Sequence, residues 1–121
     1  MPIDEIGEEL AVWGKVVRLG TRGRMSGERV WTAIGFVERS DGTVAVAAGA
    51  PSSDWALNLR ADARCELELE GRSSPCHAQE LDEADRNEAI VALILKYGTP
   101  AERLGRGPAF RLIRDSQMSV A

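Results

Sequence analysis

Residues 64–80 decide the fold, and they read RCELELEGRSSPCHAQE. The first seven alternate strictly between apolar and charged side chains, which is typical of a strand with one buried and one solvated face. Cys65, Leu67 and Leu69 are therefore predicted to point inward. Gly71 marks a turn, so residues 73–80 are predicted to return as a second strand. This pair of strands is the centre from which the rest of the chain can be placed.

The amino-terminal side predicts two more strands with a loop between them. Residues 12–19 are rich in β-branched side chains and end at Gly20, so they form a predicted strand. Residues 20–27 read GTRGRMSG, and their three glycines exclude a regular element and predict a loop. Residues 30–37 alternate again and form the next predicted strand.

A tight turn and a short helix follow. Asp41-Gly42 supplies the positive φ angles of a hairpin turn, so residues 43–48 are predicted to pair with the strand before it. Ser53 or Asp54 caps a predicted helix over residues 55–61.

The carboxy-terminal side predicts a longer helix and a last strand. Asp82 caps a helix that reaches about Tyr97, and an apolar stripe on this helix faces the sheet. The stripe consists of Ile90, Leu93, Ile94 and Tyr97. Gly98 and Pro100 end the helix, residues 105–108 form a loop, and residues 109–114 form a strand. The order β-β-β-α-β-β-α-β predicts a mainly β fold with flanking helices: a small antiparallel barrel in one domain, residues 1–121.

The charge of the chain is uneven. The net charge is −4, yet five basic residues and one acidic residue lie between Lys15 and Arg29, a local charge of +4. The acidic balance argues against a partner such as nucleic acid that is recruited by bulk charge. No apolar run approaches the roughly 18 residues of a membrane span. The acidic start of the chain lacks the pattern of a secretory signal, so a cytoplasmic location is expected.

Few side chains offer chemistry of their own. Cys65 and Cys76 with the single histidine, His77, do not make an ordinary four-ligand zinc site, and no metal is expected. Both cysteines are interpreted as small core residues. His77 has no nucleophilic partner at a recognisable spacing. The sequence therefore predicts no catalytic side chain, so a cofactor would carry the difficult step of any reaction.

Two loops could hold such a cofactor. In residues 22–27, glycine N–H groups, a serine hydroxyl and two arginines suit an anion such as phosphate, although an exposed turn with solvated arginines explains the same residues. The small residues 49–53 leave room for a flat ligand. Trp55 is then either a wall of that site or a core residue, and Asn58 either binds the ligand or ties down a loop.

These segments together resemble a known family. The ordered series LGTRGRMSG (residues 19–27), Asp41-Gly42, AGAP (residues 48–51) and WALNL (residues 55–59) is similar to the deazaflavin-dependent nitroreductase family. The similarity runs from about Val16 to Glu70. Met25 and Val30 stand where the family usually has basic residues.

The resemblance implies a split β-barrel that binds coenzyme F-420 and passes a hydride to a quinone, a nitro compound or an activated double bond. The coenzyme's phosphate and acidic tail would lie on the first loop, and its ring system on the second loop and the short helix. The residues implied are Arg22, Arg24, Ser26, Gly27, Arg29, Ala48, Gly49, Ala50, Ser52, Trp55 and Asn58. Tyr97 is the one candidate for the substrate side, although it also completes the helix stripe.

Two other functions agree with the same residues. One is a reductase of the related FMN-binding split-barrel class, which is usually dimeric with its cofactor between the subunits. The other is a barrel without catalytic activity that sequesters a deazaflavin, a tetrapyrrole or a lipid-like molecule. A small-molecule electron acceptor is the expected partner of either reductase. The chain itself is expected to be a monomer or a homodimer.

Overall fold

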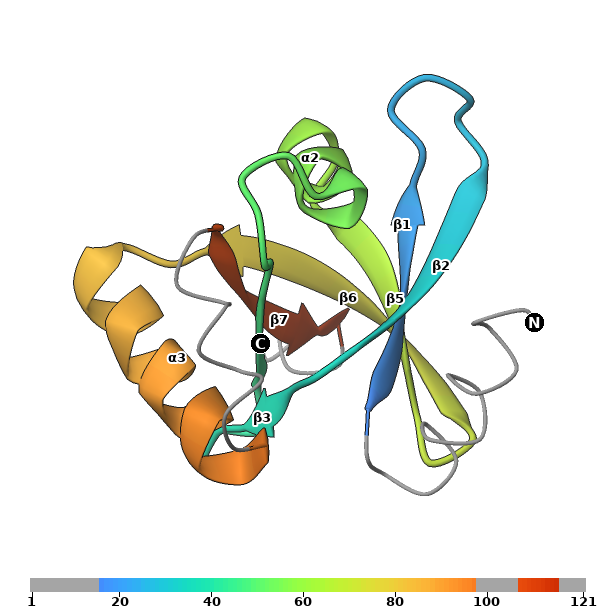
Figure 1. The fold of residues 1–121 in the computed structure, drawn as a ribbon. Helices are drawn as coiled ribbons and strands as arrows, with labels where there is room; N and C mark the ends of the chain where they lie inside the picture. Colours follow the sequence, from blue (N-terminus) through green and yellow to red (C-terminus); the bar gives the residue numbers. More distant parts are fainter. Residues whose placement is uncertain (1–15, 98–106, 116–121) are drawn as a thin grey trace.

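One curled antiparallel sheet organises the molecule (Figure 1). The structure, a computed structural model, describes residues 16–97 and 107–115. The elements are β1 (Val17–Arg22), β2 (Arg29–Ile34), β3 (Val37–Glu38), β4 (Val44–Ala47), α2 (Asp54–Ala61), β5 (Arg64–Leu69), β6 (Arg72–Glu80), α3 (Glu83–Tyr97) and β7 (Ala109–Arg114). The strand order is β2-β1-β5-β6-β7-β4-β3. This confirms the predicted mainly β fold with flanking helices.

The two edge strands of the sheet are consecutive in the chain. β2 pairs with β1 at one edge, β3 pairs with β4 at the other, and only Gly35 and Phe36 separate β2 from β3. The curled sheet is therefore closed by the covalent chain. The prediction of one continuous strand over residues 30–37 is wrong at this corner, because its two halves pair with strands that lie far apart in the sheet.

The first strand also differs from its prediction. β1 continues to Arg22, so Gly20 lies inside it, opposite Trp31 of β2. A Cβ at Gly20 would lie 2.9 Å from Cδ of Arg29 and 3.0 Å from the Trp31 ring. Glycine here makes room for the side chains of the neighbouring strand and does not end the strand. The predicted start, residues 12–15, lies outside the described residues.

The predicted hairpin of residues 64–80 is confirmed. The hairpin at Asp41-Gly42 is confirmed at its turn, but only Val37–Glu38 of the predicted strand pairs with β4, because residues 29–34 pair with β1. In β5 and β6, Cys65 lies opposite Cys76, and both are buried as predicted. In the second hairpin, the φ angle of Gly42 is 86°, and Asp41 Oδ1 accepts hydrogen bonds from the backbone N–H and the hydroxyl of Thr43 at 2.9 and 2.6 Å.

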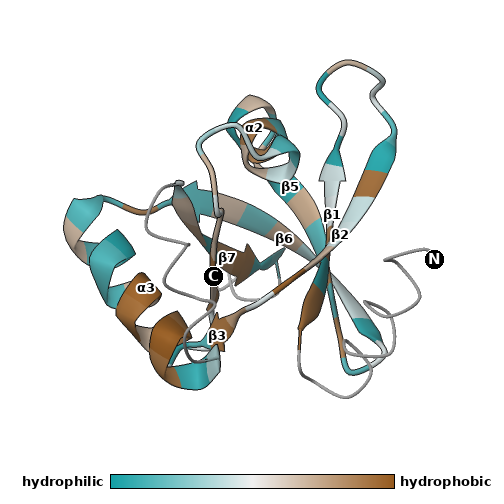
Figure 2. Ribbon diagram, viewed as in Figure 1, coloured by the Kyte–Doolittle hydropathy of each residue, from teal (hydrophilic) through white to brown (hydrophobic). Residues whose placement is uncertain are grey.

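The two helices close different surfaces of the sheet. Helix α2 closes one end of the barrel, where Trp55 packs on Phe110 with ring centroids 5.9 Å apart. Helix α3 covers the outer face of β4 and β7 with the predicted stripe, and the apolar contact includes Ala47 and Ala109. Figure 2 shows hydrophilic residues in the first turns of α3 and hydrophobic residues in the later turns. The predicted cap is also present, because Asp82 Oδ1 accepts a hydrogen bond from the N–H of Asp85 at 2.8 Å. The predicted helix end at Gly98 and Pro100 lies outside the described residues.

Candidate cofactor site

The loop between β1 and β2 is held in shape by its own backbone. The N–H of Gly23 donates to the carbonyl of Glu28 and the N–H of Gly27 donates to the carbonyl of Gly23, both at 2.8 Å. The Ser26 hydroxyl accepts from the N–H of Glu28 at 3.2 Å. Gly27 has a φ angle of 74°, which other residues rarely adopt. The loop is thus a defined turn, and its residues stay at fixed positions relative to the strands.

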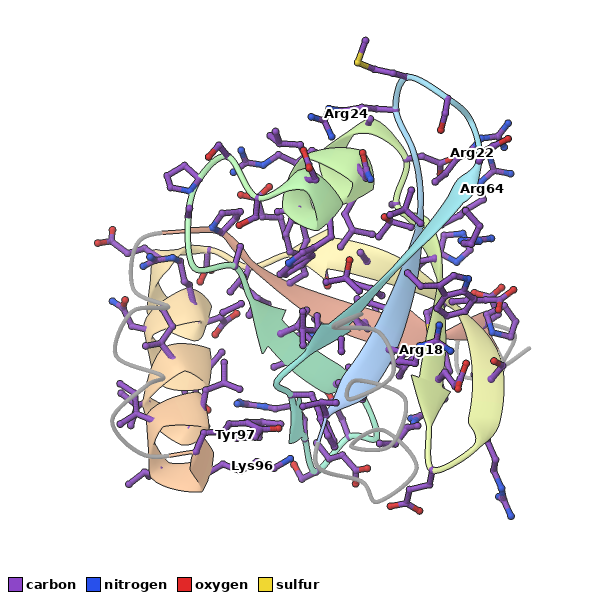
Figure 3. All side chains as sticks on the ribbon, turned by 45° about the vertical axis from the view of Figure 1, so that its right-hand side comes forward. Arg18, Arg22, Arg24, Arg64, Lys96 and Tyr97 are labelled. Atoms are coloured by element: carbon purple, nitrogen blue, oxygen red, sulfur yellow. The ribbon has the colours of Figure 1, made fainter. Side chains whose placement is uncertain are left out.

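Arg24 joins this loop to helix α2 (Figure 3). Its Nη1 donates to Asn58 Oδ1 at 2.8 Å, and its Nη2 lies 3.2 Å from the carboxylate of Asp54. The backbone N–H of Arg24 donates to the same Asn58 oxygen at 3.2 Å. Two donors of one residue therefore meet one amide oxygen. Most of the hydrogen-bonding capacity of the Arg24 guanidinium is used inside the protein.

Asn58 also connects helix α2 to strand β1 of the barrel. Its Nδ2 donates to the hydroxyl of Thr21 on β1 at 3.1 Å. Asn58 and Thr21 are both buried, with 3% and 0% of their surface exposed. The side chain of Asn58 thus connects the loop, helix α2 and strand β1, which we call the Asn58 latch (Thr21, Arg24, Asp54 and Asn58). Of the two predicted roles of Asn58, the structure shows the tie to the loop.

A groove of about 360 Å³ lies between the loop and the end of α2. Its lining consists of Arg22, Gly23, Arg24, Met25, Ser26, Gly27, Ala61 and Asp62. Hydrogen bonds from Arg64 lower the pKa of Asp62 to about 2, so this carboxylate is charged at neutral pH. Met25 is 94% exposed at the tip of the loop. The groove is open and polar, and its arginines give it positive charge.

The second predicted loop lies beside helix α2 and is only partly exposed. Ala48 is buried, and its N–H donates to the carbonyl of Pro108 at 2.9 Å. Gly107 packs so closely that a Cβ there would lie 2.4 Å from the carbonyl oxygen of Ala48. Gly49 is exposed, and a Cβ there would meet nothing within 4 Å. Space for a ligand is therefore open at Gly49, followed by exposed Ser52, whereas Trp55 is 8% exposed and belongs to the core.

Two other predicted site residues lie in different surroundings. Arg29 lies along the outer face of the sheet and donates to the carbonyl of Gly20 at 3.0 Å. Tyr97 lies at the end of α3, at the opposite end of the molecule from Arg24 in Figure 3. Its hydroxyl accepts from the N–H of Phe36 at 3.0 Å and donates to the carbonyl of the same residue at 3.2 Å. Burial raises the pKa of Tyr97. The structure does not bring Tyr97 to the groove.

The sequence reasoning missed three charged partners of this groove. Asp54 binds Arg24, Asp62 lines the groove, and Arg64 binds Asp62 through both carboxylate oxygens. One local feature of the sequence could have indicated the Asp62–Arg64 pair: the two residues of opposite charge are two positions apart where α2 ends and β5 begins.

The other reactive side chains form no catalytic group. Burial raises the pKa of the Cys65 thiol to about 12 and that of the Cys76 thiol to about 11, so both stay protonated at neutral pH. His77 Nδ1 lies 2.7 Å from Asp115 Oδ1, away from the groove. Within residues 16–97 and 107–115, no three metal-ligating side chains come together. In the same part of the chain, no helix is long and apolar enough to cross a membrane.

A second cavity lies at the other end of the sheet. It has a volume of about 320 Å³, and its lining is Glu38, Leu67, Leu69, Glu70, Arg72, Ser74 and Arg114. It contains two glutamates for its two arginines, so it lacks the positive charge of the groove beside the loop.

The fold and the site define a barrel protein with an open, arginine-lined groove between the β1–β2 loop and its capping helix. The chain belongs to the F-420H(2)-dependent quinone reductase family, whose model matches residues 4–104. Its cofactor is therefore coenzyme F-420, and it is an F-420-dependent reductase. Among curated proteins, no sequence match was found.

Solved structures share the fold. One described as an F-420-H2-dependent reductase is 24% identical, with a TM-score of 0.68, over 81% of this chain and 93% of that chain. Another, described as a domain-swapped dimer, is 22% identical with a TM-score of 0.68, over 91% of this chain and 96% of that chain. HutZ, a haem storage protein from Vibrio cholerae, is 17% identical with a TM-score of 0.68, over 94% and 91% of the two chains. These similarities confirm the split-barrel fold.

Proposed function

We propose that this protein transfers a hydride from reduced coenzyme F-420 to a quinone, and that nitro compounds and activated double bonds are further acceptors. The observation that supports this proposal is the positively charged groove beside the β1–β2 loop. Family membership supports the coenzyme, and the family's description supports quinones as the first acceptor class to test.

The residues of the groove fit the anionic half of the coenzyme. The phosphate and the glutamyl carboxylates need hydrogen-bond donors and positive charge. Arg22 supplies guanidinium N–H groups and charge, and the Ser26 hydroxyl, whose oxygen accepts from Glu28, can still donate its proton. Asp62 opposes an anion, but its charge is balanced by Arg64 at 3.0 Å. The groove is open on one side, so a long flexible tail can leave it into solvent.

The ring system of the coenzyme needs a flat surface next to the groove. Val30 is 43% exposed at the start of β2, which gives apolar surface close to the loop. The open space at Gly49 and the exposed Ser52 are the proposed second contact. Trp55 supports this surface from the core, where it packs on Phe110.

The chemistry of the proposed reaction comes from the coenzyme, which supplies the hydride when it is bound. The chain binds and orients it: the loop holds the anionic tail, and α2 holds the loop through the Asn58 latch. Asp62, the carboxylate in the lining of the groove, has a pKa lowered to about 2, so it carries no proton to donate at neutral pH. Water is therefore the proposed source of the proton that completes reduction of the acceptor. We propose no role in the reaction for Tyr97, whose hydroxyl binds the backbone of Phe36 at the corner between β2 and β3.

A titration followed by coenzyme fluorescence tests the proposal. F-420 should bind at micromolar concentration, FMN should bind more weakly, and the protein should then oxidise reduced F-420 with menadione or a nitroaromatic compound. Failure of F-420 to bind at tens of micromolar would refute the proposed function. Binding without turnover of either acceptor would instead favour a protein that sequesters the coenzyme.

A further inference from the structure

Three arginines lie in a row across the outer face of the sheet, next to the groove. Arg29 of β2 lies directly opposite Arg22 of β1. The β1–β5 register pairs Thr21 with Cys65, so its next step brings Arg64 of β5 opposite Arg22 on the other side. We call Arg29, Arg22 and Arg64 the arginine row. Like charges directly opposite each other destabilise a sheet, so the row needs an explanation.

Contacts inside the protein balance only part of this charge. Arg64 binds both carboxylate oxygens of Asp62, and its side chain is still 66% exposed. Arg29 donates to the carbonyl of Gly20. The guanidinium of Arg22 makes no hydrogen bond or close ion pair with any residue that the structure describes, and its charge acts on Asp62 from a longer distance. Asp62 is thus the carboxylate that interacts with the row, and Glu66 lies nearby on the same face of β5, opposite Gly20. Three guanidinium groups exceed these two carboxylates by one positive charge on the outer face.

The central arginine connects this surface to the groove. Arg22 lines the groove, and its Nη2 would lie 3.9 Å from a Cβ at Gly27, so the guanidinium lies against the backbone of the loop. Arg24 differs, because its guanidinium is turned toward α2 and bound to Asn58 and Asp54. Figure 3 shows the two side chains on opposite sides of the loop, with Arg22 on the side of Arg64.

We propose that the arginine row binds the anionic groups of the coenzyme tail and that Arg24 is a positioning residue, which fixes the loop without contacting the ligand. The proposal rests on the proposed function and extends it, because it assigns a binding role to Arg64. Phosphate and carboxylate oxygens form bidentate, charge-assisted hydrogen bonds with guanidinium groups. A ligand that carries several such groups along a flexible chain matches three arginines on adjacent strands.

Binding of F-420 by variants with one charge removed tests this assignment. We choose Arg22→Gln, Arg64→Gln and, as a matched control, Arg72→Gln, an exposed arginine of β6 in the cavity at the other end of the sheet. At low salt, Arg22→Gln and Arg64→Gln should each weaken F-420 binding by about tenfold and reduce its dependence on salt. Arg72→Gln should bind as the wild type does. A deazaflavin without phosphate and glutamyl tail should bind all these proteins equally.

If Arg24 only positions the loop, its variants should behave differently from those of Arg22 and Arg64. Arg24→Gln and Asn58→Ala should each weaken F-420 binding, and the double variant should be no weaker than the worse single one, because both break the same latch. The salt dependence of the remaining binding should stay that of the wild type. Additive losses, or a salt dependence reduced as in Arg22→Gln, would show that Arg24 contacts the ligand.

The outcomes separate this inference from the proposed function. If the wild type binds F-420 but Arg64→Gln behaves like Arg72→Gln, the arginine row is refuted while the proposed function stands. If Arg22→Gln and Arg64→Gln weaken binding of the deazaflavin without phosphate and glutamyl tail as much as they weaken binding of F-420, the assignment of the arginine row is also refuted. If the wild type does not bind F-420, both proposals fail. Thermal unfolding of each variant verifies that it is folded, and Arg64→Lys, which keeps the charge, should recover most of the binding at low salt.

Discussion

Helix α2 fixes the β1–β2 loop, and helix α3 fixes the corner between β2 and β3, but only the first of these corners places a positively charged side chain beside a groove. At the corner of α2, the Asn58 latch holds the β1–β2 loop, and the guanidinium of Arg22 lies next to it with no hydrogen bond or close ion pair to the described residues. At the corner of α3, the hydroxyl of Tyr97 binds both backbone groups of Phe36, where β2 turns into β3. Lys96 Nζ donates to the same carbonyl at 2.8 Å.

The difference suggests what each corner is for. At the α3 corner, the polar groups of Lys96 and Tyr97 bind the backbone of Phe36 and so stabilise the turn from β2 to β3. The α2 corner directs its polar groups at a loop whose outer side carries arginines and an open groove. The latch fixes where the loop lies, and the positive charge beside it is then available to a ligand. The following variants test this contrast, in order of decreasing effect.

Replacing the latch should have the largest effect. Asn58→Leu keeps a similar volume but leaves the Thr21 hydroxyl and the Arg24 N–H without their buried partner. We expect the free energy of unfolding to fall by about 2–4 kcal/mol, together with a loss of F-420 affinity. Denaturant unfolding and fluorescence titration measure the two effects. Asn87→Leu on the exposed side of α3 is the control and should change neither. A stable Asn58→Leu protein with normal affinity would contradict the role of the latch.

Removing the tyrosine hydroxyl should have a smaller effect, confined to stability. Tyr97→Phe deletes both hydrogen bonds to Phe36 and keeps the ring against Gly35, where a Cβ would lie 3.1 Å from Cε2. We expect a loss of about 1 kcal/mol in the free energy of unfolding, with unchanged F-420 affinity and unchanged KM for the acceptor. A raised KM without loss of stability would instead place this hydroxyl in the substrate site.

The smallest effect concerns pH. The ordinary pKa of Asp62 is 3.8, and hydrogen bonds from Arg64 lower it to about 2 in the folded protein. A lowered folded pKa adds stability above the ordinary value, and that stability is lost as the pH falls from about 4 to about 2. Asp62→Asn should therefore flatten the pH dependence of stability in this range. Identical acid unfolding profiles for the variant and the wild type would show that the Asp62–Arg64 pair contributes nothing.

Local patterns predicted most of the fold. Alternation over residues 64–70 predicts β5, and the capping residue Asp82 predicts the start of α3, because each signal lies within the element itself. The errors arise where distant strands decide the outcome. Gly20 looks like a strand end until Trp31 and Arg29 are placed beside it. The strand predicted over residues 30–37 is interrupted at Gly35 because its first half pairs with β1 and its second half with β4, which lie far apart in the sheet.

The candidate site was less predictable for the same reason. The sequence predicts an anion-binding loop from its glycines and arginines, but it does not distinguish Arg22 from Arg24. That distinction depends on Asn58, which is 34 residues from Arg24 in the chain. Arg64 joins the row only through the register of β1 and β5.

Backbone amide chemical shifts during a titration with F-420 test most directly whether the loop groove is the binding site. The largest shifts are expected for residues 23–28 of the loop and for Ala61 and Asp62, which line the groove. Tyr97 and its neighbours on α3 should not respond. Shifts that centre on Arg72, Ser74 and Arg114 in the opposite cavity, with an unchanged loop, would contradict the assignment of the site.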